Sequence, residues 1–429
     1  MIAFKPIWKP IVQKAVTGRS GRFSMRRTQP QWPDRLTSPG LYLHVPFCKN
    51  LCPYCPYNRV EYEEGLFSAY ERAVKQEIDL YAPHLKDVRF SSLYIGGGTP
   101  TVNWRGMLSI LRHIREKIGR VDDICIELHP GNMGGDCLSA LKDAGVTKLS
   151  IGVESTSDPI LERIERSHDG QTAISSVRRA MQTGFESVNV DLMFALPGQT
   201  QLDWEKDVRT IIDLGVDQLS TYPMFSFPYS DMGRKKGISQ VERPPHKVIR
   251  GMLAFTDEYC EEKGLLRCAV WSWLKPGKGK FSSITRHHYI GFGPSAASMT
   301  GSDFYVNTFD VMAYAGRLPD ERPVAVSMPM DRRLEMAYWL YWRIYELKVS
   351  EDDFRDVFGA GASLKAEFGH LLRSLLFTGM LERSGGSYHV TRPGGAYWIH
   401  RLQNEYSLSY INHLWGACRK EPWPEEVKL

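Results

Sequence analysis

The sequence predicts an α/β fold, with a partial (β/α)6 barrel of the TIM type followed by an α-rich C-terminal domain. Between residues 41 and 224, short β-rich runs alternate with segments whose apolar residues recur at helical spacing. This alternation implies parallel strands joined by right-handed crossovers. At 429 residues the chain is long enough for two or three domains, one of which can be a large barrel.

The expected elements follow one another in strict order. The six strand candidates are residues 41–47, 91–95, 123–129, 147–153, 187–195 and 217–224. The helix candidates between them are residues 65–83, 104–117, 135–144, 158–183 and 202–213. Chemistry in such barrels takes place at the C-terminal ends of the strands. Side chains that directly follow the six runs are therefore the first candidates for a functional site.

We divide the chain into four segments. Residues 1–39 form a basic N-terminal extension with eight Lys or Arg residues and one acid. It is either a solvated arm or a flap that supplies cations to an acidic substrate. Residues 40–225 form the barrel, and residues 226–312 form a barrel-capping or substrate segment with short strands. Residues 313–429 form a helical C-terminal domain, in which a helix and a small β-wing resemble a winged helix.

Composition narrows the class of protein. The net charge of +5 does not indicate a nucleic-acid partner, and the eight cysteines are too sparse for a disulfide framework, so we expect a reducing cytoplasm. We find no apolar run of about 18 residues and no signal-peptide core, so we expect no membrane span. The sequence carries no signal for an oligomeric state.

Three cysteines dominate the functional interpretation. Cys48, Cys52 and Cys55 stand at CxxxCxxC spacing directly after the first predicted strand. Structural zinc takes four ligands, an ordinary [4Fe–4S] cluster takes four cysteines, and no second CxxC follows. A [4Fe–4S] cluster held by three thiolates leaves one iron open to a substrate or cofactor. The alternatives are three unrelated thiols or an incomplete zinc site.

A glycine-rich turn follows the second predicted strand. Gly96, Gly97 and Gly98 precede Thr99 and Pro100. Glycines in this position allow the backbone to approach a ligand closely, so that its amide and carbonyl groups become the contacts. A turn of this kind is weak evidence for a binding site on its own. The evidence is stronger here because the turn follows the next predicted strand after the cysteine motif.

The cysteine spacing and the glycine turn resemble the radical S-adenosylmethionine (SAM) superfamily. Within it, the order of motifs resembles the oxygen-independent coproporphyrinogen III oxidases and their haem-chaperone relatives, over roughly residues 40–300. The motifs that carry this resemblance are Tyr42–Cys48, Gly96–Pro100, Ile126–Pro130, Leu149–Ser155, Arg166–His168, Asn189–Gln199 and Gly291–Ala296. The chain also resembles the class C radical SAM methyltransferases and cyclopropanases, which share this barrel.

The resemblance implies a set of cofactors and site residues. Cys48, Cys52 and Cys55 hold the [4Fe–4S] cluster, which reductively cleaves SAM to a 5′-deoxyadenosyl radical. A flavodoxin or ferredoxin supplies the electron, and the methyltransferase resemblance implies two SAM molecules. The residues expected at the methionine part of SAM are Tyr42, Gly97, Gly98 and Thr99. The residues expected at other parts of SAM are Tyr54, Glu127, Glu154, Arg166 and Asp191.

Several of these assignments have alternatives. Glu154 stands where the family more often has Gln, and a carboxylate there accepts a hydrogen bond but donates one only when protonated. Glu127 and Asp191, taken singly, are also consistent with strand-end carboxylates satisfied by backbone amides. Tyr54 is either a packing residue or an aromatic ring near adenine. Asp191 is a candidate acceptor for a ribose hydroxyl.

The family motifs expected on the substrate side of the site differ in this chain. The Tyr-Trp element of the haem chaperones is absent from residues 281–291, and Pro56 and Tyr57 replace the cysteine that the oxidases carry after the motif.

Three hypotheses for the function follow from these motifs and departures. The first is a radical SAM enzyme that modifies a tetrapyrrole or another flat small molecule. The second is a C-methyltransferase or cyclopropanase, and the third is a non-catalytic haem carrier.

Overall fold

Six parallel strands form the centre of the computed structural model. The structure describes residues 17–18, 23–32, 36, 38–225, 227, 229–232, 244–282, 287–392 and 412–429. The parallel strands are β2 (Gly40–Val45), β5 (Ser92–Gly97), β6 (Ile124–Leu128), β7 (Lys148–Glu154), β8 (Ser187–Phe194) and β9 (Gln218–Pro223). Each strand pairs with the next in chain order. The six predicted strands are confirmed.

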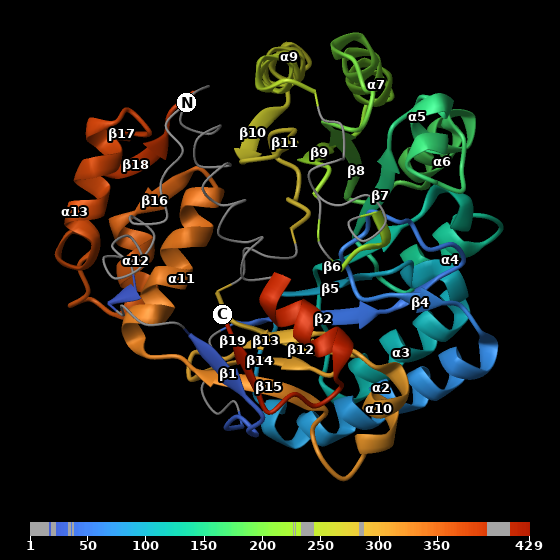
Figure 1. Cartoon of the computed structure of the whole chain (residues 1–429), viewed down its shortest axis with the longest axis vertical. Helices are drawn as coiled ribbons and strands as arrows, with labels where there is room; N and C mark the ends of the chain where they lie inside the picture. The colour runs from blue at the N-terminus through green and yellow to red at the C-terminus, as the bar shows by residue number, and fades with distance from the viewer. Residues whose placement is uncertain are drawn as a thin grey trace.

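The crossover helices lie on the outer side of the curved sheet (Figure 1). They are α2 (Glu64–Leu85), α3 (Trp104–Lys117), α4 (Cys137–Asp143), α5 (Asp158–Arg163), α6 (Gly170–Thr183) and α7 (Gln201–Asp213). The predicted helix over residues 158–183 is two helices. The break contains Glu165 in a left-handed conformation (φ 56°), and Asp169 caps α6 by accepting a hydrogen bond from the Thr172 amide. The interruption allows Arg166 and His168 to reach the strand ends.

The sheet extends far beyond the six parallel strands. Its order is β10-β11-β9-β8-β7-β6-β5-β2-β12-β13-β14-β15-β1-β19. β12 adds a seventh strand parallel to β2, and the strands after it are antiparallel. The added strands are β1 (Ser24–Arg26), β10 (Leu266–Ala269), β11 (Ser272–Leu274), β12 (Tyr289–Phe292), β13 (Ala297–Met299), β14 (Asp303–Asn307), β15 (Val324–Pro329) and β19 (Glu426–Lys428). One sheet therefore contains strands from all four predicted segments, whose boundaries stay predictions.

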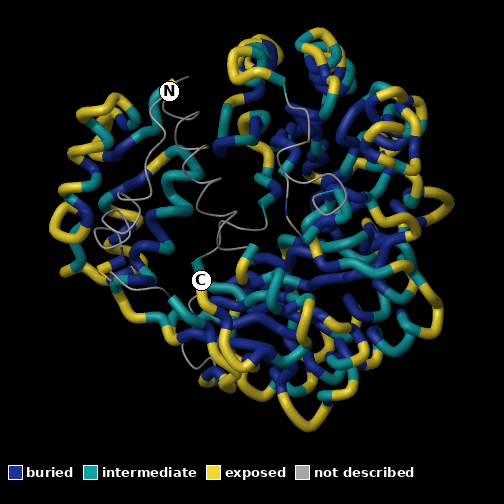
Figure 2. The backbone as a smooth tube through the Cα atoms, viewed as in Figure 1, coloured by how far each residue is buried: buried dark blue, intermediate teal, exposed yellow. Residues whose placement is uncertain are grey.

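The main core fills the space between the sheet and the outer helices. Figure 2 shows the central strands as buried and the exposed stretches mainly on the outer helices and loops. In α3 the buried residues Met107, Ile110, Leu111 and Ile114 recur at three- and four-residue spacing, which places them on one face of the helix. Parallel strands covered on both sides are apolar throughout, and four of the six residues of β2 are fully or almost fully buried apolar or glycine residues.

A second core belongs to the C-terminal module. Its elements are α11 (Arg332–Tyr345), β16 (Lys348–Ser350), α12 (Glu351–Phe358), α13 (Leu364–Phe377), β17 (Leu381–Ser384) and β18 (Ser387–Val390). Three short strands pair in the order β16-β18-β17, and the helices pack a separate apolar cluster that contains Trp339, Phe354 and Phe368. The order of these elements is that of a winged helix, as the sequence predicts: one helix, a strand, two helices and a hairpin.

A buried glutamate ties the barrel to the strands that follow it. Glu77, in the middle of α2, accepts hydrogen bonds from the Gly293 amide at 2.8 Å and from Asn307 Nδ2 at 2.7 Å, and a third from the Tyr314 hydroxyl. Burial raises the pKa of Glu77 to about 7. The three donors come from the turn after β12, from β14 and from α10 (Val311–Arg317). Because these three donors satisfy its oxygens, the carboxyl group can be buried in the core at a lower cost in free energy.

Among the residues that the structure describes, we find no helix that combines the length and the apolar character needed to cross a membrane.

Candidate functional site

The three cysteines lie on a loop that is closed at its base. β3 (Phe47–Cys48) pairs in parallel with β4 (Val60–Glu61), so the chain leaves β2, makes the loop and returns beside its own start. The Val60 amide donates to Pro46 O at 2.7 Å, and the Tyr62 amide donates to Cys48 O at 2.9 Å. The loop after the first barrel strand therefore has a fixed entry and exit, which is what a multidentate site requires.

Two arginines hold the carbonyl groups of this loop, and the sequence interpretation did not include either. Arg59 donates to Cys55 O at 2.9 Å and also bonds Cys52 O. Arg419, in the helical residues 412–420 near the C-terminus, donates to Pro56 O at 3.0 Å and Tyr57 O at 2.5 Å. Arg59 stands beside the motif and could have been suspected. Arg419 lies more than 360 residues away, and no sequence signal connects it to the loop.

The thiols are held in a setting that disfavours their charge. All three cysteines are free, with Cys48 buried and Cys52 and Cys55 half-buried. Burial raises the pKa of Cys48, and burial raises the pKa of Cys55 to about 12. Thiolates are the form that binds metal, so a bound cation favours the ionisation of Cys48 and Cys55. A simple set of reactive thiols would instead have lowered pKa values.

The glycine turn leaves no room for side chains. A Cβ on Gly98 would lie 2.7 Å from Phe47 O and 3.0 Å from Cys48 Sγ. Gly97 has φ 120°, and a Cβ there would lie 2.7 Å from the His44 ring. The Thr99 hydroxyl faces Cys48 Sγ at 3.7 Å. The turn therefore packs directly against the first cysteine, and its contact with a ligand stays a prediction.

Glu127 is bound to the glycine turn. Its carboxylate accepts hydrogen bonds from the Gly97 amide at 3.0 Å and from the Tyr94 hydroxyl. Burial raises its pKa, although the Tyr94 and Gly97 hydrogen bonds work in the opposite direction. This is the backbone-satisfied arrangement that the sequence left open as the alternative. It makes Glu127 a support for the turn, and a contact with a ligand stays a prediction.

Tyr42 belongs to a hydrogen-bonded chain beneath the turn. The Tyr42 hydroxyl lies 2.8 Å from His44 Nδ1, and His44 Nε2 lies 2.8 Å from Asn58 O. A carbonyl oxygen only accepts, so His44 carries its proton on Nε2 and Tyr42 donates to Nδ1. Burial lowers the pKa of His44 to about 4, so the ring is neutral at pH 7. His44 is part of the Tyr42–Cys48 motif, but the motif alone did not indicate a role for it.

Arg166 lies between the cysteine loop and the end of β7. It donates toward Cys52 Sγ at 3.5 Å, bonds Gly152 O, and lies 3.9 Å from Glu154 Oε1. Its Nε is buried and has no hydrogen-bond partner among the described residues. Glu154 is held in a left-handed conformation (φ 66°), at a register shift in β7, and accepts from the Tyr222 hydroxyl at 2.8 Å. Strained residues of this kind concentrate at functional sites.

Asp191 completes a group of three carboxylates at the strand ends. It accepts from the Ser150 hydroxyl at 2.7 Å and from Asn189 Nδ2 at 2.8 Å. Burial, and then repulsion from Glu154 and Glu127, raises its pKa to about 7. The electrostatic effects of Glu154 and Glu127 on Asp191 show that the three carboxyl groups lie near one another, and their role in binding SAM stays a prediction. They favour a ligand that carries positive charge.

Tyr54 occupies an apolar cluster beside the loop. It is buried among Ile160, Ile164, Met193 and Leu196, with Cys52 and Cys55 packed against the same cluster. This packing is one of the two roles that the sequence left open. It also gives the cysteine pair an apolar wall, and a contact with adenine stays a prediction.

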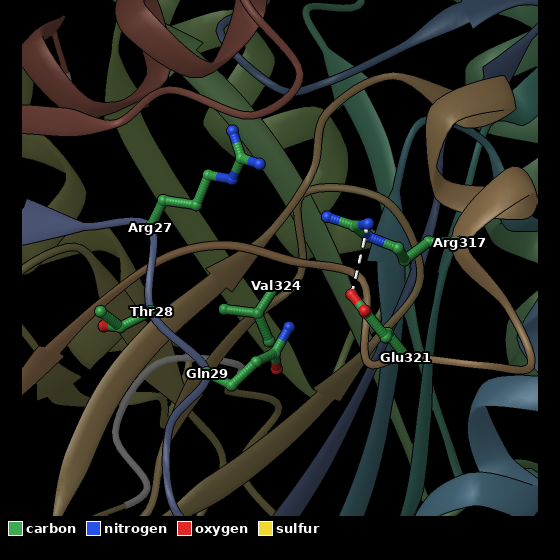
Figure 3. Close-up of a pocket in the computed structure, with 6 residues that line it drawn as sticks. All are labelled: Arg27, Thr28, Gln29, Arg317, Glu321 and Val324. Atoms are coloured by element: carbon green, nitrogen blue, oxygen red, sulfur yellow. Dashed lines mark ion pairs between the residues drawn. The ribbon is translucent and has the colours of Figure 1, made fainter.

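A surface pocket of about 260 Å³ lies elsewhere, at the far edge of the sheet (Figure 3). Its lining contains none of the predicted site residues. Its cations are already paired, because Arg317 lies 3.3 Å from Glu321 and Arg27 lies 2.8 Å from Glu425. We therefore place the candidate site at the cysteine loop and not at this pocket.

The residues at the loop suit an iron–sulfur cluster and a charged cofactor. Three buried or half-buried thiols, a side-chain-free glycine surface and an orphaned Arg166 Nε converge where the barrel strands end. Three protein thiolates leave one iron of a [4Fe–4S] cluster without a protein ligand. Backbone groups of the turn and the nearby carboxylates can bind the polar end of a small molecule.

Residues 42–211 match the family model of the Radical SAM superfamily, and this match implies a [4Fe–4S] cluster and SAM. It indicates an enzyme of the radical SAM type and does not resolve the reaction.

The curated relatives fall in the group that the sequence motifs resemble, the coproporphyrinogen III oxidases and the haem chaperones. The heme chaperone HemW of Bacillus subtilis (strain 168) is 26% identical over 363 residues, which cover 82% of this chain and 95% of the relative. The oxygen-independent coproporphyrinogen III oxidase of Escherichia coli (strain K12) is 26% identical over 310 residues, covering 68% of this chain and 67% of the relative. Both relationships confirm the predicted resemblance, and at this identity they do not select one activity.

The fold agrees with the same group. The solved structure of coproporphyrinogen III oxidase (HemN) from Escherichia coli superimposes with a TM-score of 0.76 at 21% identity. The match covers 90% of this chain and 94% of that one. The predicted fold class is confirmed.

We predict that Gly98→Ala prevents normal assembly of the metal site. The added Cβ meets the Phe47 backbone and Cys48 Sγ, and crowding of this kind shifts the backbone that carries the cysteine. After anaerobic reconstitution, we expect the variant to retain about half or less of the wild-type iron per chain. Gly65→Ala is the matched control, because Gly65 lies in α2 with nothing within 4 Å of its would-be Cβ. Full iron content in Gly98→Ala would contradict the assignment.

Proposed function

We propose that this chain reductively cleaves SAM at a [4Fe–4S] cluster held by Cys48, Cys52 and Cys55, and uses the resulting radical on a tetrapyrrole or another flat small molecule. The observation that carries the proposal is the closed cysteine loop against the glycine turn, with three carboxylates and Arg166 beside it. The cluster supplies the electron that breaks the carbon–sulfur bond of SAM. The chain supplies the ligands, the binding surface for SAM and the shielding from water.

The polar groups around the loop suit the charges of SAM. SAM carries a positive ammonium group, a positive sulfonium group and a carboxylate. The group Glu127, Glu154 and Asp191 attracts the positive charges, and Arg166 can balance the carboxylate. Asp191, partly exposed between the two donors that hold it, can accept a ribose hydroxyl. Glu127 contributes by holding the turn in place and Tyr42 by supporting it from below.

The tetrapyrrole assignment rests on the relatives. Their printed names describe a heme chaperone and a coproporphyrinogen III oxidase, and a further relative, 29% identical over 214 residues, is the anaerobilin synthase of Escherichia coli O157:H7. We propose a related flat substrate for this chain. Trp273 is buried and donates a hydrogen bond to Asp257 at 2.8 Å, so its ring is not available to stack on a flat substrate. Trp271 lies in the turn before β11 and contacts Phe225 and Tyr345.

Two other functions use the same cofactors. A C-methyltransferase or cyclopropanase with two SAM molecules is favoured by Pro56 and Tyr57, which replace the cysteine expected after the motif. A non-catalytic haem carrier is favoured by the coverage of 95% of HemW from Bacillus subtilis. An electron donor such as flavodoxin or ferredoxin would serve all three.

The decisive experiment is product analysis after anaerobic reconstitution with iron and sulfide, reduction and addition of SAM. We expect 5′-deoxyadenosine from the wild type and none from Cys52→Ala. Cys137→Ala is the control, because Cys137 is a buried free thiol in α4 outside the loop. It should keep both iron and product.

The by-products separate the candidates. 5′-Deoxyadenosine without S-adenosylhomocysteine supports hydrogen abstraction without methyl transfer, whereas both together support the methyltransferase. A wild type that binds about four irons, never cleaves SAM and binds haem stoichiometrically would overturn the proposal in favour of the carrier.

Asp191 gives SAM binding a predicted pH dependence. Its pKa of about 7 means that acidification protonates it, and a protonated carboxyl group accepts the ribose hydroxyl less well. We expect the Kd for SAM, measured by calorimetry on the reconstituted protein, to rise toward about tenfold per pH unit below pH 7. Asp191→Asn should bind more weakly and lose this slope. An unchanged slope in Asp191→Asn would assign the dependence to another group.

A further inference from the structure

A second cluster of ligand-type side chains lies away from the cysteine loop. Among the described residues, His287, His288 and Glu335 are the one group of three His, Cys, Asp or Glu side chains whose ligand atoms all lie within 4.8 Å of one another. Both imidazole Nε2 atoms lie 2.9 Å from the same oxygen, Glu335 Oε1. The cysteines of the loop do not meet this criterion, as expected for thiolates that bind different irons of one cluster.

The cluster joins two parts of the fold. His287 and His288 directly precede β12, and His288 O accepts from the amide of Gly40, the first residue of β2, at 2.9 Å. Glu335 lies in the first turn of α11, the first helix of the C-terminal module. The cysteine loop follows the opposite end of β2. The two sites are therefore separated by at least the length of that strand, about 16 Å.

The distances suit a single divalent ion. Two ligand bonds of about 2.1 Å place their atoms about 3.0 Å apart at a right angle and about 3.4 Å apart in a tetrahedron. The observed separations of 2.9 Å require only a small outward movement. Gly301 provides room beside the cluster, because a Cβ there would lie 3.0 Å from His288 Nε2.

One cation lies near the cluster. Arg343 interacts electrostatically with His287 and is itself paired with Glu346 at 2.7 Å.

The protonation state of His287 is set by its contact with Glu335. His287 Nδ1 is buried and has no hydrogen-bond partner among the described residues. In the metal-free arrangement both rings must carry their proton on Nε2 to donate to Glu335. Metal binding at Nε2 moves that proton to Nδ1 without net proton release, and the Nδ1–H then requires an acceptor such as water.

We propose that His287, His288 and Glu335 bind one divalent transition-metal ion of the Zn²⁺ type, which links the main sheet to the C-terminal module. Two imidazoles and one carboxylate are ligands that Zn²⁺ prefers, and water completes the shell at this half-buried position. The ion is structural and takes no part in radical chemistry. The inference uses none of the residues of the proposed function, so each can fail without the other.

The test is zinc retention by the reconstituted holoprotein after dialysis against a weak chelator, with zinc and iron measured together. We expect about one zinc per chain in the wild type and at least a tenfold loss of affinity in His287→Ala and Glu335→Gln, with iron unchanged. Glu335→Gln preserves size and a hydrogen-bond acceptor, so it is the variant that should fold normally. Zinc should also raise the Tm of the wild type and not that of the variants.

The matched control is His113→Ala. His113 pairs with Asp79 at 3.0 Å on the surface, in a pair with one histidine only, and its loss should leave zinc retention unchanged. X-ray absorption at the zinc edge should show nitrogen and oxygen ligands. Sulfur ligands would place the zinc at the cysteines, and equal retention by wild type and His287→Ala, or no retention by the wild type, would overturn the proposal.

Discussion

Three thiolates in a partly buried loop are unfavourable in free energy, and the structure around the loop depends on this constraint. Burial raises the pKa of Cys48 and Cys55, so a bound cation favours the charged form of these two thiols. Its geometry must therefore be right before the metal binds. The β3–β4 pairing closes the loop, Arg59 and Arg419 hold its carbonyl groups, and the glycine turn packs against Cys48. Each of these features positions sulfur without occupying its coordination sites.

The surrounding polar groups form two opposed sets. Arg166 links Cys52 to the end of β7, whereas Glu127, Glu154 and Asp191 gather on neighbouring strand ends. Burial raises the pKa of all three carboxyl groups, and repulsion from neighbouring acids adds to the effect at Glu127 and Asp191. Such a site gains most from a ligand that brings positive charge to the carboxylates, which is the physical basis for proposing SAM there. Glu127 also supports the turn through Gly97, so the same residue holds the turn and belongs to the proposed SAM site.

Much of this could be predicted from the sequence, because local patterns carry it. The six strand ranges are right to within two residues at each end, since buried parallel strands are short apolar runs with clear limits. The helix over 158–183 was wrong as one element, because apolar spacing continues across a break that tertiary contacts of Arg166 stabilise. Arg419 and Tyr222 could not be found, because their partners are distant in sequence. The role of His44 needed the Asn58 carbonyl, which only the fold brings to it.

The central claim is that the three cysteines leave one iron free for SAM. Electron paramagnetic resonance of the reduced, reconstituted protein tests it most directly, because a ligand that binds iron changes the spectrum of the cluster. We predict a [4Fe–4S]⁺ signal whose g-values shift when SAM is added. A signal that SAM leaves unchanged at saturating concentration, with iron content intact, would show that the fourth iron is closed to SAM and would contradict this account.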